Sequence, residues 1–122
     1  MKTAIAPPLT PAWQVLCQRT DLVPFSGVAA WVETAAGPAQ VALFYVPGST
    51  PELYALDHRD PVADANVNAR GIVGDLKGQR VVASPLYKHH FRLSDGQCLE
   101  HPEVQLRIWT VCFRGDEVWI EA

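Results

Sequence analysis

The sequence lacks any long hydrophobic run, and this absence sets the first limit on what the protein can be. A membrane-spanning helix needs about 20 consecutive apolar residues, and no apolar run among the 122 residues approaches that length. The first residues, MKTAIAPPLTPAW, also lack the apolar stretch of about 7–15 residues that a secretory signal requires. We therefore expect no membrane partner and a cytoplasmic location.

Cysteine is scarce as well. The chain has three, Cys17, Cys98 and Cys112, which is an odd number with no two close in sequence. A disulfide framework normally shows an even number of cysteines at short spacings. The pattern instead suits free thiols in a reducing cytoplasm.

An excess of basic charge is also missing. The formal net charge is −3, whereas nucleic-acid-binding domains normally display a basic face, so no nucleic-acid partner is expected. Gly-rich phosphate loops are absent, and no nucleophile, base and acid stand in a recognisable arrangement. We therefore assign catalysis to no residue of this chain.

The sequence does contain many short runs rich in Val, Ile, Trp, Tyr and Phe, separated by turn residues. That pattern is typical of an all-β sandwich or barrel. We expect an extended N-terminal arm over residues 1–12, stiffened by prolines, and one antiparallel β domain over residues 13–122. The four tryptophans at strand positions are expected in the core. Expected strands cover residues 13–17, 28–33, 40–46, 52–57, 71–75, 79–83, 91–93, 106–113 and 117–121.

Two irregular segments interrupt the strand pattern. The first, HRDPVADANVN at residues 58–68, is polar and small, and a helical turn is predicted to begin near Pro61. The second covers residues 84–90. We expect both segments to be loops at one end of the sandwich.

The residues that frame these two loops resemble Rieske [2Fe–2S] domains. Tyr54-Ala55-Leu56 resembles the strand before the first ligand loop, and residues 85–96 resemble the second loop and its exit strand. In that family one loop supplies Cys-x-His and the other Cys-x-x-His, so that two thiolates hold one iron and two imidazoles the other. The resemblance implies a Rieske-like antiparallel β-sandwich.

The same resemblance places the four ligand positions on residues that do not suit a cluster. The cysteine positions fall on Asp60 and Ser84, and the histidine positions on Val62 and Tyr87. Because such clusters are held by thiolate and imidazole, we expect an empty cluster site and no metal. Tyr87 is predicted to fill the vacated space, with its hydroxyl bonded to a group such as Asp60.

A more specific resemblance comes from residues 81–100, VVASPLYKHHFRLSDGQCLE. They closely resemble the small subunit of bacterial NAD(P)H-dependent assimilatory nitrite reductase, and the resemblance extends from about Trp13 to Trp119. It implies a non-catalytic partner of a large subunit that carries FAD, a [4Fe–4S] cluster and sirohaem. That large subunit would use NAD(P)H to reduce nitrite to ammonium, while this chain would bind none of these cofactors.

Basic and histidine side chains gather near the two loops of this acidic protein. They could form a docking face for the large subunit or simply a solvated loop tip; the candidate contact residues are Arg59, Lys88, His89, His90 and Arg92. A slipped register could instead place His89 or His90 on a metal. Two further alternatives are a Rieske-type electron-transfer ferredoxin with atypical ligation and a regulatory binding module unrelated to nitrite.

Overall fold

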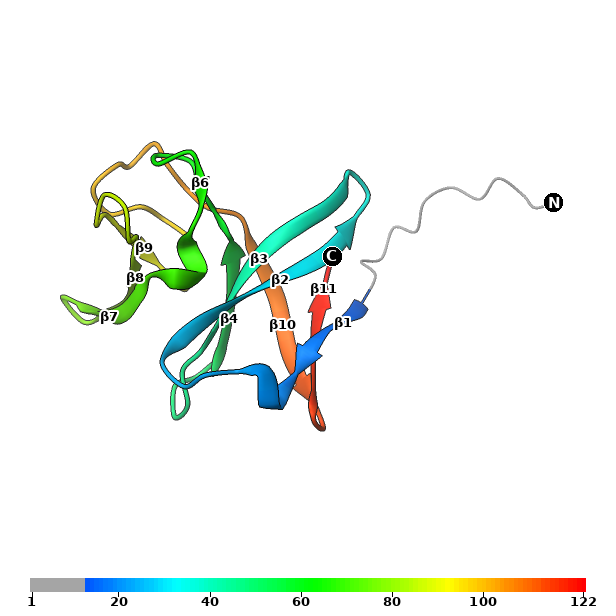
Figure 1. Ribbon diagram of the computed structural model, residues 1–122. Helices are drawn as coiled ribbons and strands as arrows, with labels where there is room; N and C mark the ends of the chain where they lie inside the picture. The colour runs from blue at the N-terminus through cyan, green and yellow to red at the C-terminus, as the bar shows by residue number, and fades with distance from the viewer. Residues whose placement is uncertain (1–12) are drawn as a thin grey trace.

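The computed structural model describes residues 13–122, and these residues form three antiparallel sheets (Figure 1). The expected arm, residues 1–12, lies outside the described residues. The all-β antiparallel architecture is confirmed. The strands are β1 (Trp13–Gln18), β2 (Ser26–Thr34), β3 (Gly37–Tyr45), β4 (Leu53–Asp57), β5 (Arg59–Asp60), β6 (Ala65–Asn66), β7 (Ile72–Leu76), β8 (Gln79–Ala83), β9 (His90–Arg92), β10 (Ile108–Arg114) and β11 (Glu117–Glu121), with 3-10 helices η1 (Arg19–Asp21) and η2 (Asn68–Arg70).

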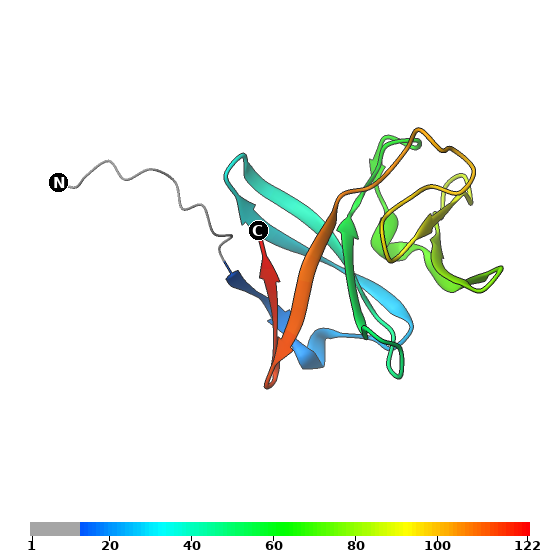
Figure 2. The same ribbon diagram turned by 180° about the vertical axis from the view of Figure 1, so that it is seen from behind.

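The largest sheet has the strand order β1-β11-β10-β4-β3-β2 and curls on itself, as the view from behind shows (Figure 2). Its first and last strands meet through the side chain of Gln14 on β1. The Gln14 amide donates to the carbonyl of Glu33 at 2.9 Å and accepts from the Glu33 N–H at 3.0 Å. The Gln14 side chain thus takes the place of a backbone hydrogen-bond pair between the two edge strands. Without it, the backbone N–H and C=O of Glu33 would be unpaired at the sheet edge.

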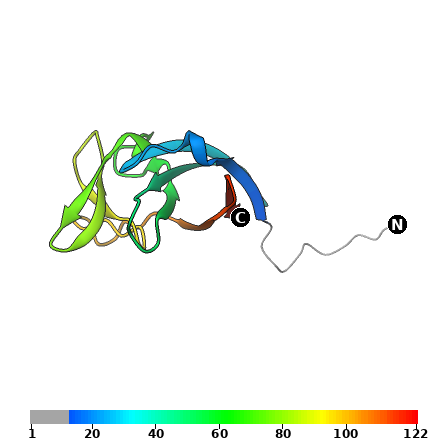
Figure 3. The same cartoon turned by 90° about the horizontal axis from the view of Figure 1, so that it is seen from below.

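The other two sheets form a smaller lobe. β5 and β6 make a short hairpin, and β7, β8 and β9 make a three-stranded sheet. Seen from below, this lobe lies on the side of the molecule away from the C-terminus (Figure 3). We call the part made by β5–β9 and the segments between them the loop lobe, because it holds both predicted loops.

Strand β3 separates two hydrophobic cores, which explains its almost unbroken apolar sequence. Val41 and Leu43 point into the curl of the large sheet, where they join Trp109 and Ile120. Ala42 and Phe44 point the other way, into a second core shared with the loop lobe: Val46, Leu56, Ala69, Val82, Phe91, Leu93, Cys98 and Leu106. Residues 41–44 are fully buried, so burial on both faces of this strand is confirmed.

Two local expectations were wrong. The helical turn predicted near Pro61 is instead the tight turn of the β5–β6 hairpin, and the first 3-10 turn after it comes at Asn68. Trp31 was expected in the core, but its side chain is 63% exposed on β2, whereas Trp109 is buried as expected. Within residues 13–122, no helix has the length and apolar character needed to cross a membrane.

Candidate functional site

The two predicted loops meet at a buried carboxylate. Asp60 ends strand β5 and is completely buried. Ser84 immediately follows β8, and His89 immediately precedes β9; both are also buried. The hairpin β5–β6 therefore carries the acid, and the two ends of the second loop carry its partners.

The side chains of Ser84 and His89 are both hydrogen-bonded directly to the Asp60 carboxylate. The Ser84 hydroxyl donates to Oδ2 of Asp60 at 2.6 Å. Nε2 of His89 lies 2.9 Å from Oδ2 and 3.1 Å from Oδ1 of the same carboxylate. The backbone N–H groups of Val62 and Ala63 also donate to Oδ1, at 2.9 and 3.3 Å. We call Asp60, Ser84 and His89 the carboxylate clasp.

Hydrogen bonds within the clasp compensate the buried negative charge of Asp60. Burial by itself raises the pKa of Asp60, but the hydrogen bonds from Ser84, His89 and the Ala63 N–H outweigh it and hold that pKa below its ordinary value of 3.8. Since an ionised carboxylate only accepts hydrogen bonds, the pattern assigns a proton to Nε2 of His89. Nδ1 of His89 is buried and has no hydrogen-bond partner among residues 13–122.

Backbone bonds close the loop between the two clasp residues. The Ser84 N–H donates to the carbonyl of His89 at 2.8 Å, and the Lys88 N–H donates to the carbonyl of Ser84 at 3.0 Å. Lys88 adopts the left-handed conformation, with φ of 58°. The four residues between the clasp residues, 85–88, all lie on the surface.

Tyr87 does not fill the site, so that prediction was wrong. Its side chain is 68% exposed, and its ring lies outside His89, with 6.4 Å between the ring centroids. His89 occupies the place expected for Tyr87. The two adjacent histidines differ in exposure, because His89 is buried while the side chain of His90 is 30% exposed.

A second buried polar group, made by His58 and Asn68, holds the ends of the hairpin, and no specific sequence pattern predicted it. Nδ1 of His58 accepts the N–H of Ala69 at 3.1 Å. The Asn68 amide donates to the carbonyls of Asp57 and Arg59 at 2.9 and 3.3 Å. Burial, followed by the charge of Arg70, lowers the pKa of His58 from its ordinary value of 6.5. His58 therefore stays neutral as an acceptor within the lobe.

The five predicted contact residues differ in exposure and pairing, and their contact with a partner stays a prediction. Arg59 pairs with Asp64, and Arg92 forms a two-bond pair with Asp95. His90 bonds Glu100 through both its backbone N–H and its ring, each at 2.7 Å. His89 is buried in the clasp and presents almost no side-chain surface. Lys88 is exposed and, among residues 13–122, has no ion-pair partner.

The residues in this place do not fit a [2Fe–2S] cluster. Such a Rieske centre needs two thiolates and two imidazoles around a space that holds the metal. The atoms at the two cysteine positions are instead oxygens in direct contact, those of Asp60 and Ser84. Among residues 13–122, no group of three or more His, Cys, Asp or Glu side chains is arranged to hold a metal ion.

The fold and this site can now be compared with known proteins. The chain matches the Rieske-like [2Fe-2S] domain family over residues 12–121. It is 38% identical to the nitrite reductase (NADH) small subunit of Salmonella typhimurium, over 78% of this chain and 83% of that protein. The chain belongs to the Rieske-like family of nitrite reductase small subunits.

Two further comparisons place this family membership in context. The NMR structure of the Escherichia coli protein NirD aligns with a TM-score of 0.79 and 31% identity, covering 91% of this chain and 96% of that one. The chain is also 36% identical to the nitrite reductase [NAD(P)H] large subunit of Klebsiella oxytoca over 108 residues. That match covers 88% of this chain but spans only 11% of the Klebsiella protein.

Proposed function

We propose that this chain is the non-catalytic small subunit of an NAD(P)H-dependent nitrite reductase and assembles with a large subunit that does the chemistry. The observation that carries the proposal is the match within the Klebsiella large subunit. A domain of this family is a separate chain in Salmonella and part of the large-subunit polypeptide in Klebsiella. Domains that are joined covalently in one species commonly act side by side when they are separate.

The clasp supports a structural role for the chain within that complex. In the proposed enzyme, FAD, a [4Fe–4S] cluster and sirohaem belong to the large subunit, which reduces nitrite to ammonium in the cytoplasm with electrons from NAD(P)H. This chain holds its loops together by hydrogen bonds to Asp60 rather than through thiolates. It would therefore position or stabilise the large subunit without carrying electrons.

Copurification tests the proposal. A tagged copy of this chain is expressed with the large subunit from the same organism, and the eluate is examined for a sirohaem spectrum and for nitrite reduction driven by NADH or NADPH. We expect both to elute with the chain, and activity to fall when the chain is omitted. Elution of this chain alone, with the large subunit fully active without it, would contradict the proposal.

A further inference from the structure

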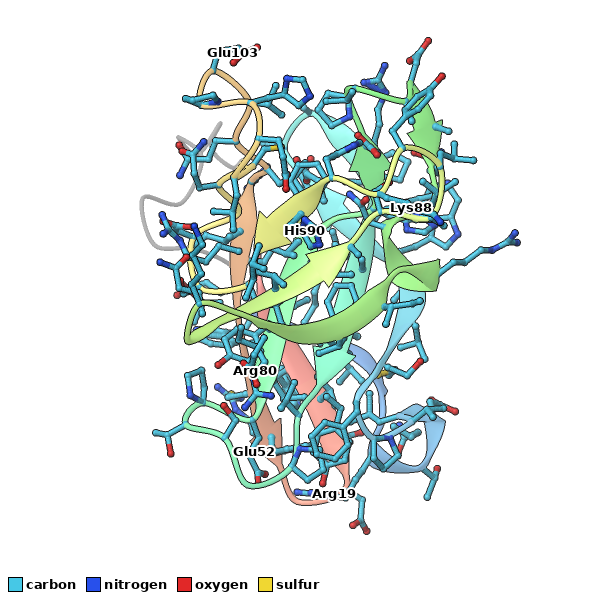
Figure 4. The ribbon with its side chains drawn as sticks, turned by 90° about the vertical axis from the view of Figure 1, so that its left-hand side faces the viewer. Arg19, Glu52, Arg80, Lys88, His90 and Glu103 are labelled. Carbon is cyan, nitrogen blue, oxygen red and sulfur yellow. The ribbon has the colours of Figure 1, made fainter. Side chains whose placement is uncertain are left out.

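A cavity opens on the loop lobe between the start of β7 and the loop that the clasp closes. Its volume is about 490 Å³, and its lining includes Arg70, Ile72, Pro85, Lys88 and His90. Figure 4 looks onto this lobe, with Lys88 above β7 and His90 on β9, which is separated from β7 by β8. Arg19 and Glu52 lie at the opposite end. Among the described residues, no acidic side chain lines the cavity.

The basic residues of the chain are not distributed evenly around its surface. Within residues 13–122, only Arg70, Lys77 and Lys88 among the lysines and arginines have no ion pair, side-chain hydrogen bond or cation–π contact. Two of these three, Arg70 and Lys88, flank this one cavity. The cavity therefore has a positive rim on which Arg70 and Lys88 have no carboxylate partner in the part of the chain that the structure describes.

Apolar side chains are exposed beside the same rim. Ile72 is 77% exposed, more than any other large apolar residue that the structure describes, and Leu86 and Tyr87 project from the adjoining loop. A single exposed apolar side chain is common. Three such residues next to two unpaired cations are a composition more typical of protein interfaces, where aromatic residues and arginine are enriched.

The clasp holds this surface in a fixed shape. Both ends of the exposed loop, Ser84 and His89, are tied to the buried Asp60, and two backbone bonds close the loop between them. A surface held in its bound shape loses little conformational entropy on association. The buried network would thus serve binding by keeping residues 85–88 ready for a partner.

We propose that Arg70, Ile72 and residues 85–88, here called the cavity face, dock onto an acidic, apolar-centred surface of the nitrite reductase large subunit. This inference rests on the proposed function. A second copy of the chain is a poorer occupant, because carboxylates such as Glu33 and Glu121, which have no ion pair among residues 13–122, lie on the six-stranded sheet. Pairing the cavity face with them would give a head-to-tail contact that does not close into a dimer.

Charge reversal tests the electrostatic part of the cavity face. The affinity of the full chain for the purified large subunit is measured for Arg70→Glu and Lys88→Glu, after circular dichroism confirms that each variant is folded. We expect each substitution to weaken binding roughly tenfold or more and to reduce its salt dependence. Lys77→Glu is the matched control, since it makes the same charge change on the third unpaired cation, and it should alter the affinity by less than about twofold.

Ile72→Thr tests the apolar part and keeps the β-branched shape that suits a strand. Ile108→Thr is its control, because Ile108 is also an exposed strand isoleucine but lies on β10, away from the cavity. We expect Ile72→Thr to weaken binding several-fold, independently of salt, and Ile108→Thr to leave it unchanged.

The outcomes separate this inference from the function on which it rests. If the unmodified chain binds the large subunit and the cavity-face variants bind equally well, the docking surface is wrong while the proposed function stands. If the unmodified chain does not bind, both fail. Self-association of the chain that is lost in Arg70→Glu, with binding to the large subunit intact, would overturn the choice of partner.

Discussion

At the scale of single residues, Asp60 connects the two loops of the lobe. Its carboxylate receives hydrogen bonds from the side chains of Ser84 and His89 and from two backbone N–H groups of its own hairpin. Removing a buried charge leaves these donors without a partner, whereas an amide of the same shape can still pair with some of them. We therefore expect Asp60→Ala to destabilise the fold by roughly 3–5 kcal/mol and Asp60→Asn by about 1–2 kcal/mol, measured by urea unfolding.

The ionisation of Asp60 also makes the stability difference between the unmodified chain and Asp60→Asn depend on pH. Because the pKa of Asp60 is lower in the folded chain than in the unfolded chain, its charge stabilises the fold above about pH 4. That contribution is lost as the pH falls through the folded pKa. The stability difference between the unmodified chain and Asp60→Asn should therefore shrink below about pH 4. A difference that stays constant down to about pH 2 would mean that folding does not lower the pKa of Asp60.

His58 titrates in a higher pH range than Asp60, and here the fold favours the neutral form of the side chain. Burial lowers its pKa in the folded chain, so the unfolded chain takes up a proton first as the pH falls below 6.5. Stability should therefore decrease between about pH 7 and pH 5. In His58→Asn, whose amide oxygen can still accept the Ala69 N–H, this part of the decrease should disappear. Parallel stability curves for the two chains over that range would contradict the assignment.

At the scale of elements, the turn after β9 depends on a close approach that only glycine permits. Gly96 has φ of 78°, and a Cβ there would lie 2.3 Å from the carbonyl oxygen of Leu106. Gly78 has nearly the same φ, 81°, with nothing within 4 Å of the added atom. Both alanine variants pay the left-handed backbone cost of about 1–2 kcal/mol, but Gly96→Ala should cost at least about 1 kcal/mol more. Equal losses in thermal or urea unfolding would show that the turn relaxes freely.

The sequence predicted most strands because their apolar residues alternate or run continuously over five or more positions. It missed the β5–β6 hairpin since strands of two residues are too short for any period to be visible. It also placed Tyr87 inside and listed His89 among the candidate contact residues. That choice depends on the backbone bonds between Ser84 and His89 and on the left-handed Lys88, which together turn the loop outward. Side-chain alternation begins only at β9 and cannot specify the loop.

At the scale of the whole molecule, the curled sheet and the loop lobe share one wall, β3 and β4, with a separate core on each side. The residues around Ser84 and Pro85 could be recognised from the sequence as a Rieske-like loop. That resemblance correctly predicted that Asp60 and Ser84 lie at the same site. The sequence could not reveal that the two residues touch directly, since a 24-residue separation carries no distance information. The chain keeps the Rieske-like fold, but the atoms that join its two loops are the side-chain oxygens of Asp60 and Ser84 and the imidazole of His89.

We infer that this lobe is held by the carboxylate clasp and not by an iron–sulfur cluster. Iron and acid-labile sulfide are therefore measured in the full chain after anaerobic purification, together with its absorbance in the visible range. From this inference we expect a folded, colourless protein with far less than one iron atom per chain. Close to two irons and two sulfides per chain, with the visible spectrum of a [2Fe–2S] centre, would contradict it.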